Sequence, residues 1–380
     1  MKYIKGFLKW FIGIIVLLVA ILYITDYEYI IKGVRVVYMT GHTTAYIDDY
    51  PHFENSEIKK GAPQPWAQHK NYNQATATQR LKTTHEKLGT IAYVIIKNDS
   101  LWYEHYDEGY GLDSKTNSFS MAKSITVSLL AKAIQDGYIK SINQPIGDFF
   151  EQYADAKTTV GDLASMASGL DWNESYTSPF SVTARAYYDD DISETMLNQK
   201  VVEEPGKSFK YLSGSTQLLG LIIEKATGQK MPEYLSESFW KPLGMEQDAL
   251  WQLDDDKNQV AKTYCCIASN ARDFARFGKL YKNHGVWNDK RILDSTFTAI
   301  ATHKRFVDDP EYGYGFWLSD HLDKHIFVMR GILGQYVITI PEDDLIIVRL
   351  GHHIGSFTGA SFTTDFYTYV EEAYQMLDSL

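Results

Sequence analysis

The sequence is poor in cysteine and in positive charge, and both scarcities narrow what the protein can be. Its 380 residues include two cysteines, and these are neighbours, Cys265 and Cys266. A disulfide between adjacent residues is strained relative to ordinary disulfide geometry, so the sequence predicts two buried or semi-buried thiols. The formal net charge is -11. This charge argues against a nucleic-acid-binding protein, because such proteins need a basic face.

Motifs for metals and nucleotides are missing as well. The sequence has no His-Glu-x-x-His pattern, no glycine-rich phosphate loop and no internal repeat. His352 and His353 are neighbours in a stretch with strand character, so their side chains point to opposite faces. We therefore expect neither a metal nor an organic cofactor.

The chain has one long apolar run, at its N-terminus. Three lysines among the first nine residues precede an apolar stretch from Trp10 to Ile24, which approaches the length needed to span a bilayer. No small-x-small cleavage site follows, which favours an uncleaved signal anchor over the alternative, a cleaved signal peptide. The lysines favour a cytoplasmic N-terminus. We expect residues 1–25 to be a single-pass anchor in the cell (inner) membrane, with a periplasmic or extracellular domain.

The remaining residues indicate a connector and one α+β domain. Residues 26–77 are polar and irregular and predict a connector, and residues 78–380 predict the domain. Two strands are expected over 90–106, three more over 325–351, and mainly helices between them over 231–300. This order predicts an antiparallel sheet built from the N- and C-terminal portions, flanked by helices, with a mostly helical insertion.

A lysine stands near the start of one of the most apolar helical segments. The stretch "NSFSMAKSITVSLLAKAI" (117–134) predicts a helix that is apolar on most faces and therefore buried, with Asn117 or Ser118 as its cap. Burial would lower the pKa of Lys123 and make it a base near neutral pH. Ser120 lies one turn earlier, where such a base can activate it as a nucleophile. The alternative is a lysine whose stem packs while its ammonium group reaches water.

Four ordered stretches resemble the serine β-lactamase-like superfamily, in its class C β-lactamase, D-alanyl-D-alanine carboxypeptidase and esterase branch. The resemblance covers about residues 78–378 and implies a β-lactamase/transpeptidase-like fold. The stretches that carry it are "FSMAKS" (119–124), "TTVGDLASMASGLDW" (158–172), "PGKSFKYLSGSTQLLGLIIEKATGQ" (205–229) and "SNARDFARFGKLY" (269–281).

The resemblance implies a role for each matching residue. Ser120 would be the nucleophile, and Lys123 and Tyr211 would transfer protons, with the acylation base left open between those two. Gly331 aligns with the glycine of a family strand motif. The backbone N–H groups of Ile332 and Ser120 would then form the oxyanion hole.

The sequence also departs from the β-lactamase pattern. Ser213 stands where β-lactamases typically have asparagine, and the lysine-threonine-glycine motif is missing. Arg330 can take the place of the motif lysine, or strand alternation turns it away from the site. The stretches at 168–181 and 330–337 resemble the esterase and 6-aminohexanoate-dimer hydrolase subgroup more than true β-lactamases, and Tyr176 matches a substrate-contacting loop tyrosine there.

The expected function is a serine hydrolase that cleaves a small-molecule or peptide substrate at an ester or amide bond. The alternatives within this class are a D-Ala-D-Ala carboxypeptidase and a β-lactamase. From other classes, the alternatives are an acyl-binding sensor without turnover and a purely structural surface protein. The oligomeric state is not indicated by any feature of the sequence.

Overall fold

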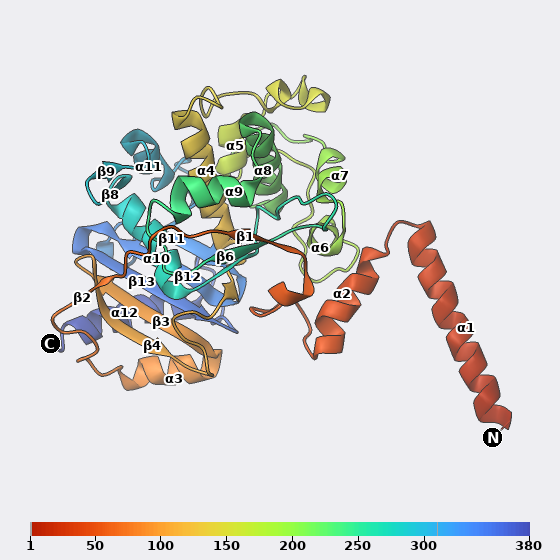
Figure 1. The fold of residues 1–380 in the computed structure, drawn as a ribbon, viewed down its shortest axis with the longest axis horizontal. Coiled ribbons are helices and arrows are strands. Elements are labelled where there is room, and N and C mark those ends of the chain that lie inside the picture. Colours follow the sequence, from red (N-terminus) through yellow and green to blue (C-terminus); the bar gives the residue numbers. More distant parts are fainter. Residues whose placement is uncertain (1, 310) are drawn as a thin grey trace.

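The computed structural model describes residues 2–309 and 311–380. Figure 1 shows one main body and an N-terminal helix, α1 (Lys2–Ile24), that extends away from it. The stretch Tyr3–Ile24 is long and apolar enough to cross a membrane, with a mean hydropathy of 2.6, and none of it is buried. A shorter helix, α2 (Tyr29–Val37), follows and packs against the body.

The centre of the body is a seven-stranded sheet with the strand order β10-β11-β12-β13-β3-β4-β2. Neighbouring strands are antiparallel, except that β2 runs parallel to β4. The N-terminal pair of strands and the C-terminal group therefore meet at β3 and β13, as the sequence predicts. The strands are β2 (Ala67–Gln68), β3 (Thr90–Lys97), β4 (Ser100–Tyr106), β10 (Trp317–Ser319), β11 (Ile326–Gly331), β12 (Gln335–Ile340) and β13 (Leu345–Gly351).

Both faces of this sheet are covered, which explains why its central strands are apolar almost throughout. Successive side chains of a strand point to opposite faces, so Ile95 and Val94 of β3 belong to two different cores. The Ile95 core is closed by α3 (Gln79–Leu88) and α12 (Thr364–Leu377). The Val94 core continues into α10 (Ala271–Lys282) and the helical half of the molecule.

The helical half lies between β4 and β10 in the sequence. Its central helix is α4 (Met121–Gln135), which is buried along most of its length and packs against α8. The other helices are α5 (Val160–Ala164), α6 (Val182–Tyr188), α7 (Ile192–Leu197), α8 (Ser213–Thr227), α9 (Met231–Leu235) and α11 (Ser295–Ala301).

Residues 231–300 contain α9, α10 and α11, in line with the expectation of mainly helices, and this half of the molecule also contains short strands that the sequence does not predict. A four-stranded sheet has the order β1-β6-β7-β5, and a small hairpin pairs β8 with β9. Each of these strands has two to four residues, too few to show a local hydrophobic period, and each depends on a partner that is distant in sequence or on a turn. They are β1 (Asn55–Ile58), β5 (Thr116–Asn117), β6 (Ala249–Gln252), β7 (Ile267–Ser269), β8 (Val286–Trp287) and β9 (Lys290–Arg291).

The expected connector, residues 26–77, is joined to the body at several points. Its strand β1 pairs with β6, and β2 pairs with β4. Trp66 is buried, and its indole N–H donates to the carbonyl of Arg272 at 3.0 Å. The segment therefore adds strands to both sheets before the chain enters α3.

Candidate active site

The turn that carries Ser120 is fixed by hydrogen bonds on both sides. The strand β5 leads into it, and the N–H of Ser118 donates to the carbonyl of Ile267 at 2.8 Å. The side chain of Asn117 accepts from the N–H of Phe119 at 2.8 Å, and Phe119 has a left-handed φ of 45°. Such backbone is strained for a residue other than glycine and persists where its surroundings hold it.

The position of the helix start differs from the one expected. Ser120, rather than Asn117 or Ser118, occupies the N-cap of α4, and its side chain makes no capping hydrogen bond. Asn117 is instead used inside the turn and in a contact with Asp49. The Ser120 hydroxyl is therefore left to face Lys123.

Lys123 is buried, with 1% of its surface exposed, so the alternative of an ammonium group that reaches water is wrong. Its Nζ lies 2.9 Å from Ser120 Oγ and donates to the carbonyl of Tyr264 at 2.8 Å. Burial lowers the pKa of Lys123 to about 7, although the charge of Glu174 acts in the opposite direction. An amine with this pKa is available as a base near neutral pH, because a lone pair replaces one of its protons.

Tyr211 stands beside this pair, two residues before α8. Its ring lies 5.1 Å from Lys123 Nζ and stacks on Trp317 at 5.3 Å between ring centroids. Burial raises the pKa of the Tyr211 phenol above its ordinary value, and the nearby Glu174 adds to this, while a hydrogen bond with Ser120 acts against it. The phenol is therefore protonated at neutral pH, which differs from the phenolate that a charged lysine beside it would favour.

The end of β11 passes very close to the Ser120 turn. A Cβ at Gly331 would lie 2.4 Å from the carbonyl oxygen of Ser118, so only glycine fits there. The chain then turns through the short 3₁₀ segment Ile332–Gly334, in which Leu333 has a left-handed φ of 62°. This approach explains why Ile332 and Ser120 line the same pocket.

The pocket beside Ser120 has an aromatic wall formed by Phe119, Tyr176, Tyr187, Tyr188 and Tyr264. Ser213 and Tyr176, both predicted from the sequence, also line it. Cys265, Thr44 and Ala184 line it as well.

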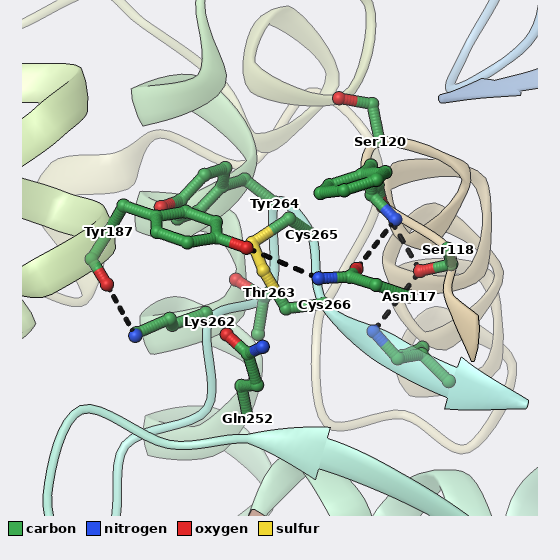
Figure 2. The surroundings of a disulfide bond; sticks show 12 residues. Asn117, Ser118, Ser120, Tyr187, Gln252, Lys262, Thr263, Tyr264, Cys265 and Cys266 are labelled. Carbon is green, nitrogen blue, oxygen red and sulfur yellow. Dashed lines mark hydrogen bonds between the residues drawn. A yellow bond between two sulfur atoms is a disulfide. The ribbon is translucent and has the colours of Figure 1, made fainter. Parts of the chain in front are cut away.

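Cys265 and Cys266 form a disulfide in one wall of this pocket, which corrects the expectation of two free thiols. Figure 2 shows the disulfide beside the hydrogen bond that the Asn117 amide donates to the Tyr187 hydroxyl at 3.2 Å. Both cysteines are buried as expected. Cys266 has a φ of 76°, a left-handed backbone conformation that the local sequence does not predict.

Glu174 is the polar residue of the site that sequence reasoning missed. Its carboxylate accepts from the N–H and from the hydroxyl of Ser213, both at 2.6 Å, and also from the hydroxyl of Tyr176. It therefore caps the N-terminus of α8, where a negative charge is stabilising. Glu174 lies 39 residues before Ser213, so no local capping pattern marks it.

Arg330 lies outside the lining of the pocket. Its guanidinium group stacks on Trp317 and Phe362 and donates to the carbonyl of Ser361 at 2.7 Å. Trp317 also stacks on Tyr211. The structure thus brings together Ser120, Lys123 and Tyr211, whereas Arg330 contacts Trp317, Phe362 and Ser361 outside the pocket.

Comparisons with known proteins show the family of the chain. The family model for beta-lactamase matches residues 74–357. The 6-aminohexanoate-dimer hydrolase of Paenarthrobacter ureafaciens is 25% identical over 301 residues, which are 73% of this chain and 76% of that protein.

Solved structures show the same fold. One from Bacillus anthracis, assigned provisionally as a 6-aminohexanoate-dimer hydrolase, has a TM-score of 0.73 and 22% identity, over 87% of this chain and 91% of that one. A family VIII carboxylesterase has a TM-score of 0.60 and 14% identity, over 79% and 98% of the two chains. The α+β, β-lactamase/transpeptidase-like fold expected from the sequence is confirmed.

Proposed function

Because this chain belongs to the beta-lactamase family of serine hydrolases, we propose that it cleaves an ester or amide through an acyl-enzyme on Ser120. One observation carries the proposal. The buried Lys123 amine, with a pKa of about 7, lies 2.9 Å from Ser120 Oγ. A serine is a weak nucleophile until a neighbouring base takes its proton, and this contact supplies the base.

In acylation, neutral Lys123 takes the Ser120 proton while Oγ attacks the substrate carbonyl carbon. One amine N–H stays on the Tyr264 carbonyl, so the lone pair faces the serine. The backbone N–H groups of Ser120 and Ile332 hold the oxyanion. Tyr211, protonated because its pKa is raised, gives a proton to the leaving alcohol or amine and regains one from Lys123.

In deacylation, a water molecule attacks the acyl carbonyl and gives its proton to Lys123. The bond between the acyl carbon and Ser120 Oγ then breaks, and Lys123 returns its proton to Oγ. In this scheme Lys123 is the acylation base and Tyr211 the acid, because the directions of their pKa shifts favour that division.

The substrate would lie in the aromatic pocket, against Tyr176, Ser213 and the Gly331 backbone. The relative from Paenarthrobacter supports an amide or ester substrate, since its name describes hydrolysis of a 6-aminohexanoate dimer. Arg330 supports the same choice over a β-lactam, because its stacking on Trp317 and its bond to Ser361 keep it from serving as a carboxylate site.

We further assign residues 1–25 as an uncleaved signal anchor, residues 26–77 as the connector and residues 78–380 as the hydrolase domain. The exposed apolar stretch Tyr3–Ile24 and the three lysines at or near its start, Lys2, Lys5 and Lys9, support an anchor with a cytoplasmic N-terminus. The hydrolase domain would then lie on the periplasmic or extracellular side.

The direct test is ester turnover by the full chain in mild detergent. Wild-type protein is expected to hydrolyse p-nitrophenyl butyrate, and Ser120→Ala is expected to lower kcat/KM by at least about a thousandfold. Ser356→Ala, at an exposed serine, is the control and is expected to retain full activity. Equal turnover by Ser120→Ala and wild type would disprove the proposal.

Activity should rise with pH as Lys123 loses its proton, and Glu174→Gln is expected to shift this rise in kcat/KM to lower pH. The Glu174 charge raises the pKa of Lys123, so its removal makes the amine lose its proton more easily. The free energy of unfolding should fall by about 0.5–1 kcal/mol, because α8 loses a charged cap. Glu86→Gln, at an exposed position on α3, is the control. If kcat/KM of Glu174→Gln rises at the same pH as in the wild type, or at a higher pH, the electrostatic role is contradicted.

A further inference from the structure

Helix α2 has two apolar faces, and one of them is uncovered. Tyr29, Val36 and Val37 are buried against the body. Ile31, Val34 and Tyr38 recur at spacings of three and four on the opposite side, and their exposed fractions are 36%, 39% and 65%. A helix with apolar residues on an exposed face suits an apolar surface better than water.

A groove runs between α2 and the loop that leads into α6. Its α2 wall includes Tyr29, Gly33, Val34 and Val37, and its other wall includes Tyr176, Pro179, Ala184 and Tyr188. Apart from hydroxyl groups, these side chains are apolar.

This groove adjoins the pocket of Ser120. Thr44, Tyr176, Ala184 and Tyr188 line both spaces. An apolar chain with its carbonyl at Ser120 would therefore have a route along these four residues to α2.

The outer end of the groove is held near the end of the membrane helix. Four residues separate α1 from α2, which allows at most roughly 18 Å even when extended. Arg185 of α6 pairs with Asp26 of this link at 2.8 Å, and the Tyr29 hydroxyl donates to the Pro179 carbonyl at 2.9 Å. Both groove walls are thus tied to the point where the chain leaves the membrane helix.

We propose that the groove binds the acyl chain of a membrane-borne amphiphile whose ester or amide carbonyl is cleaved at Ser120. This rests on the hydrolase and anchor assignments of the proposed function, and it adds the substrate class. The uncovered face of α2 would lie on the bilayer surface, and the acyl chain would pass from the bilayer along α2 to the nucleophile. The acyl group stays on Ser120 until water releases it as a fatty acid, and the alcohol or amine leaves first.

The test uses the full chain in phosphatidylcholine vesicles with 4-methylumbelliferyl butyrate or laurate as substrate. Each buried methylene favours binding by roughly fourfold, so the laurate-to-butyrate ratio of kcat/KM is expected to exceed about 100 for the wild type. Ala184→Phe fills the junction of groove and pocket and should lower this ratio at least about tenfold. Thr44→Trp, at an exposed residue of the same junction, should lower the ratio too.

Ala299→Phe is the matched control, because Ala299 is exposed on α11 and lines neither space. Partition of the esters into vesicles is the same for all variants, so a changed ratio reports on the groove. Laurate placed in the same vesicles as the enzyme should be cleaved at least about tenfold faster than laurate placed in separate vesicles.

The outcomes separate this inference from the function it rests on. Ser120-dependent hydrolysis with equal ratios in wild type, Ala184→Phe and Thr44→Trp would overturn the groove while leaving the hydrolase intact. Equal rates from shared and separate vesicles would overturn the membrane source of the substrate. Absence of Ser120-dependent hydrolysis for both esters would overturn the hydrolase, and the groove proposal with it.

Discussion

Lys123→Met is expected to lower kcat/KM for an ester by three to four orders of magnitude, since general base catalysis contributes about 10²–10⁴-fold. The substitution removes the group that lies 2.9 Å from Ser120 Oγ and leaves an apolar side chain of similar length. Lys123→Arg should be equally inactive, because a guanidinium group keeps its proton throughout the accessible pH range. Lys132→Met, on the same helix but paired with Asp136 at the surface, is the control for effects on α4.

The dependence of kcat/KM on pH tests the role of Lys123 as base independently of the substitutions. Below about 7 the Lys123 amine is protonated and has no lone pair, so wild-type kcat/KM should rise with pH through about 7 and then level off. A flat profile from pH 5 to 9, or activity retained in Lys123→Arg, would contradict the role of Lys123 as base.

The free energy of unfolding should depend on pH in a different range from the activity. The folded-state pKa of Lys123 lies below the ordinary 10.5, so the folded chain binds fewer protons than the unfolded chain between about 7 and 10.5. The contribution of Lys123 therefore makes the free energy of unfolding rise with pH in that range, and Lys123→Met is expected to remove this contribution. Urea unfolding at several pH values measures this, and a folded but inactive Lys123→Met variant separates catalysis from folding.

Arg349→Met is expected to lower the free energy of unfolding by about 3–5 kcal/mol, because it leaves buried acceptors without their charged donor. Arg349 is fully buried on β13. Its guanidinium group donates to the carbonyls of Leu333 and Gly334 at 2.8 and 2.9 Å, to that of Leu88 at 2.8 Å, and to Thr90 Oγ1 at 3.1 Å.

Two of these acceptors belong to the turn that follows Ile332. Loss of Arg349 should therefore lower esterase activity in the protein that still folds, since the N–H of Ile332 is a proposed oxyanion donor. Arg291→Met, at an exposed arginine, is the control. A urea midpoint for Arg349→Met equal to that of wild type would show that this network does not hold the turn.

The features that the sequence predicted correctly have local signals. The Asn98–Asp99 turn lies between two apolar runs, and β3 and β4 follow from it. Ser120 and Lys123 are three residues apart on one helix, so their proximity follows from helix geometry alone. The sheet followed from strands at both ends of the domain.

The features that were missed depend on partners distant in sequence or on unusual backbone. Glu174 reaches Ser213 across 39 residues, and Arg349 reaches Leu88 across 261. The Cys265–Cys266 disulfide was rejected on general geometry, whereas the backbone at Cys266 takes a left-handed φ. The raised pKa of Tyr211 depends on its burial and on the charge of Glu174, and neither can be read from the motif.

The central claim is that the substrate acylates Ser120 and that water then hydrolyses this acyl-enzyme. Acid quenching of the full chain within its first turnovers with p-nitrophenyl butyrate, followed by intact-mass measurement and peptide mapping, tests it most directly. The account predicts one butyryl group on the peptide that contains Ser120, its loss as substrate is exhausted, and no adduct in Ser120→Ala. A butyryl group that persists without turnover would indicate an acyl-binding sensor, and turnover with no adduct on Ser120 would contradict the account.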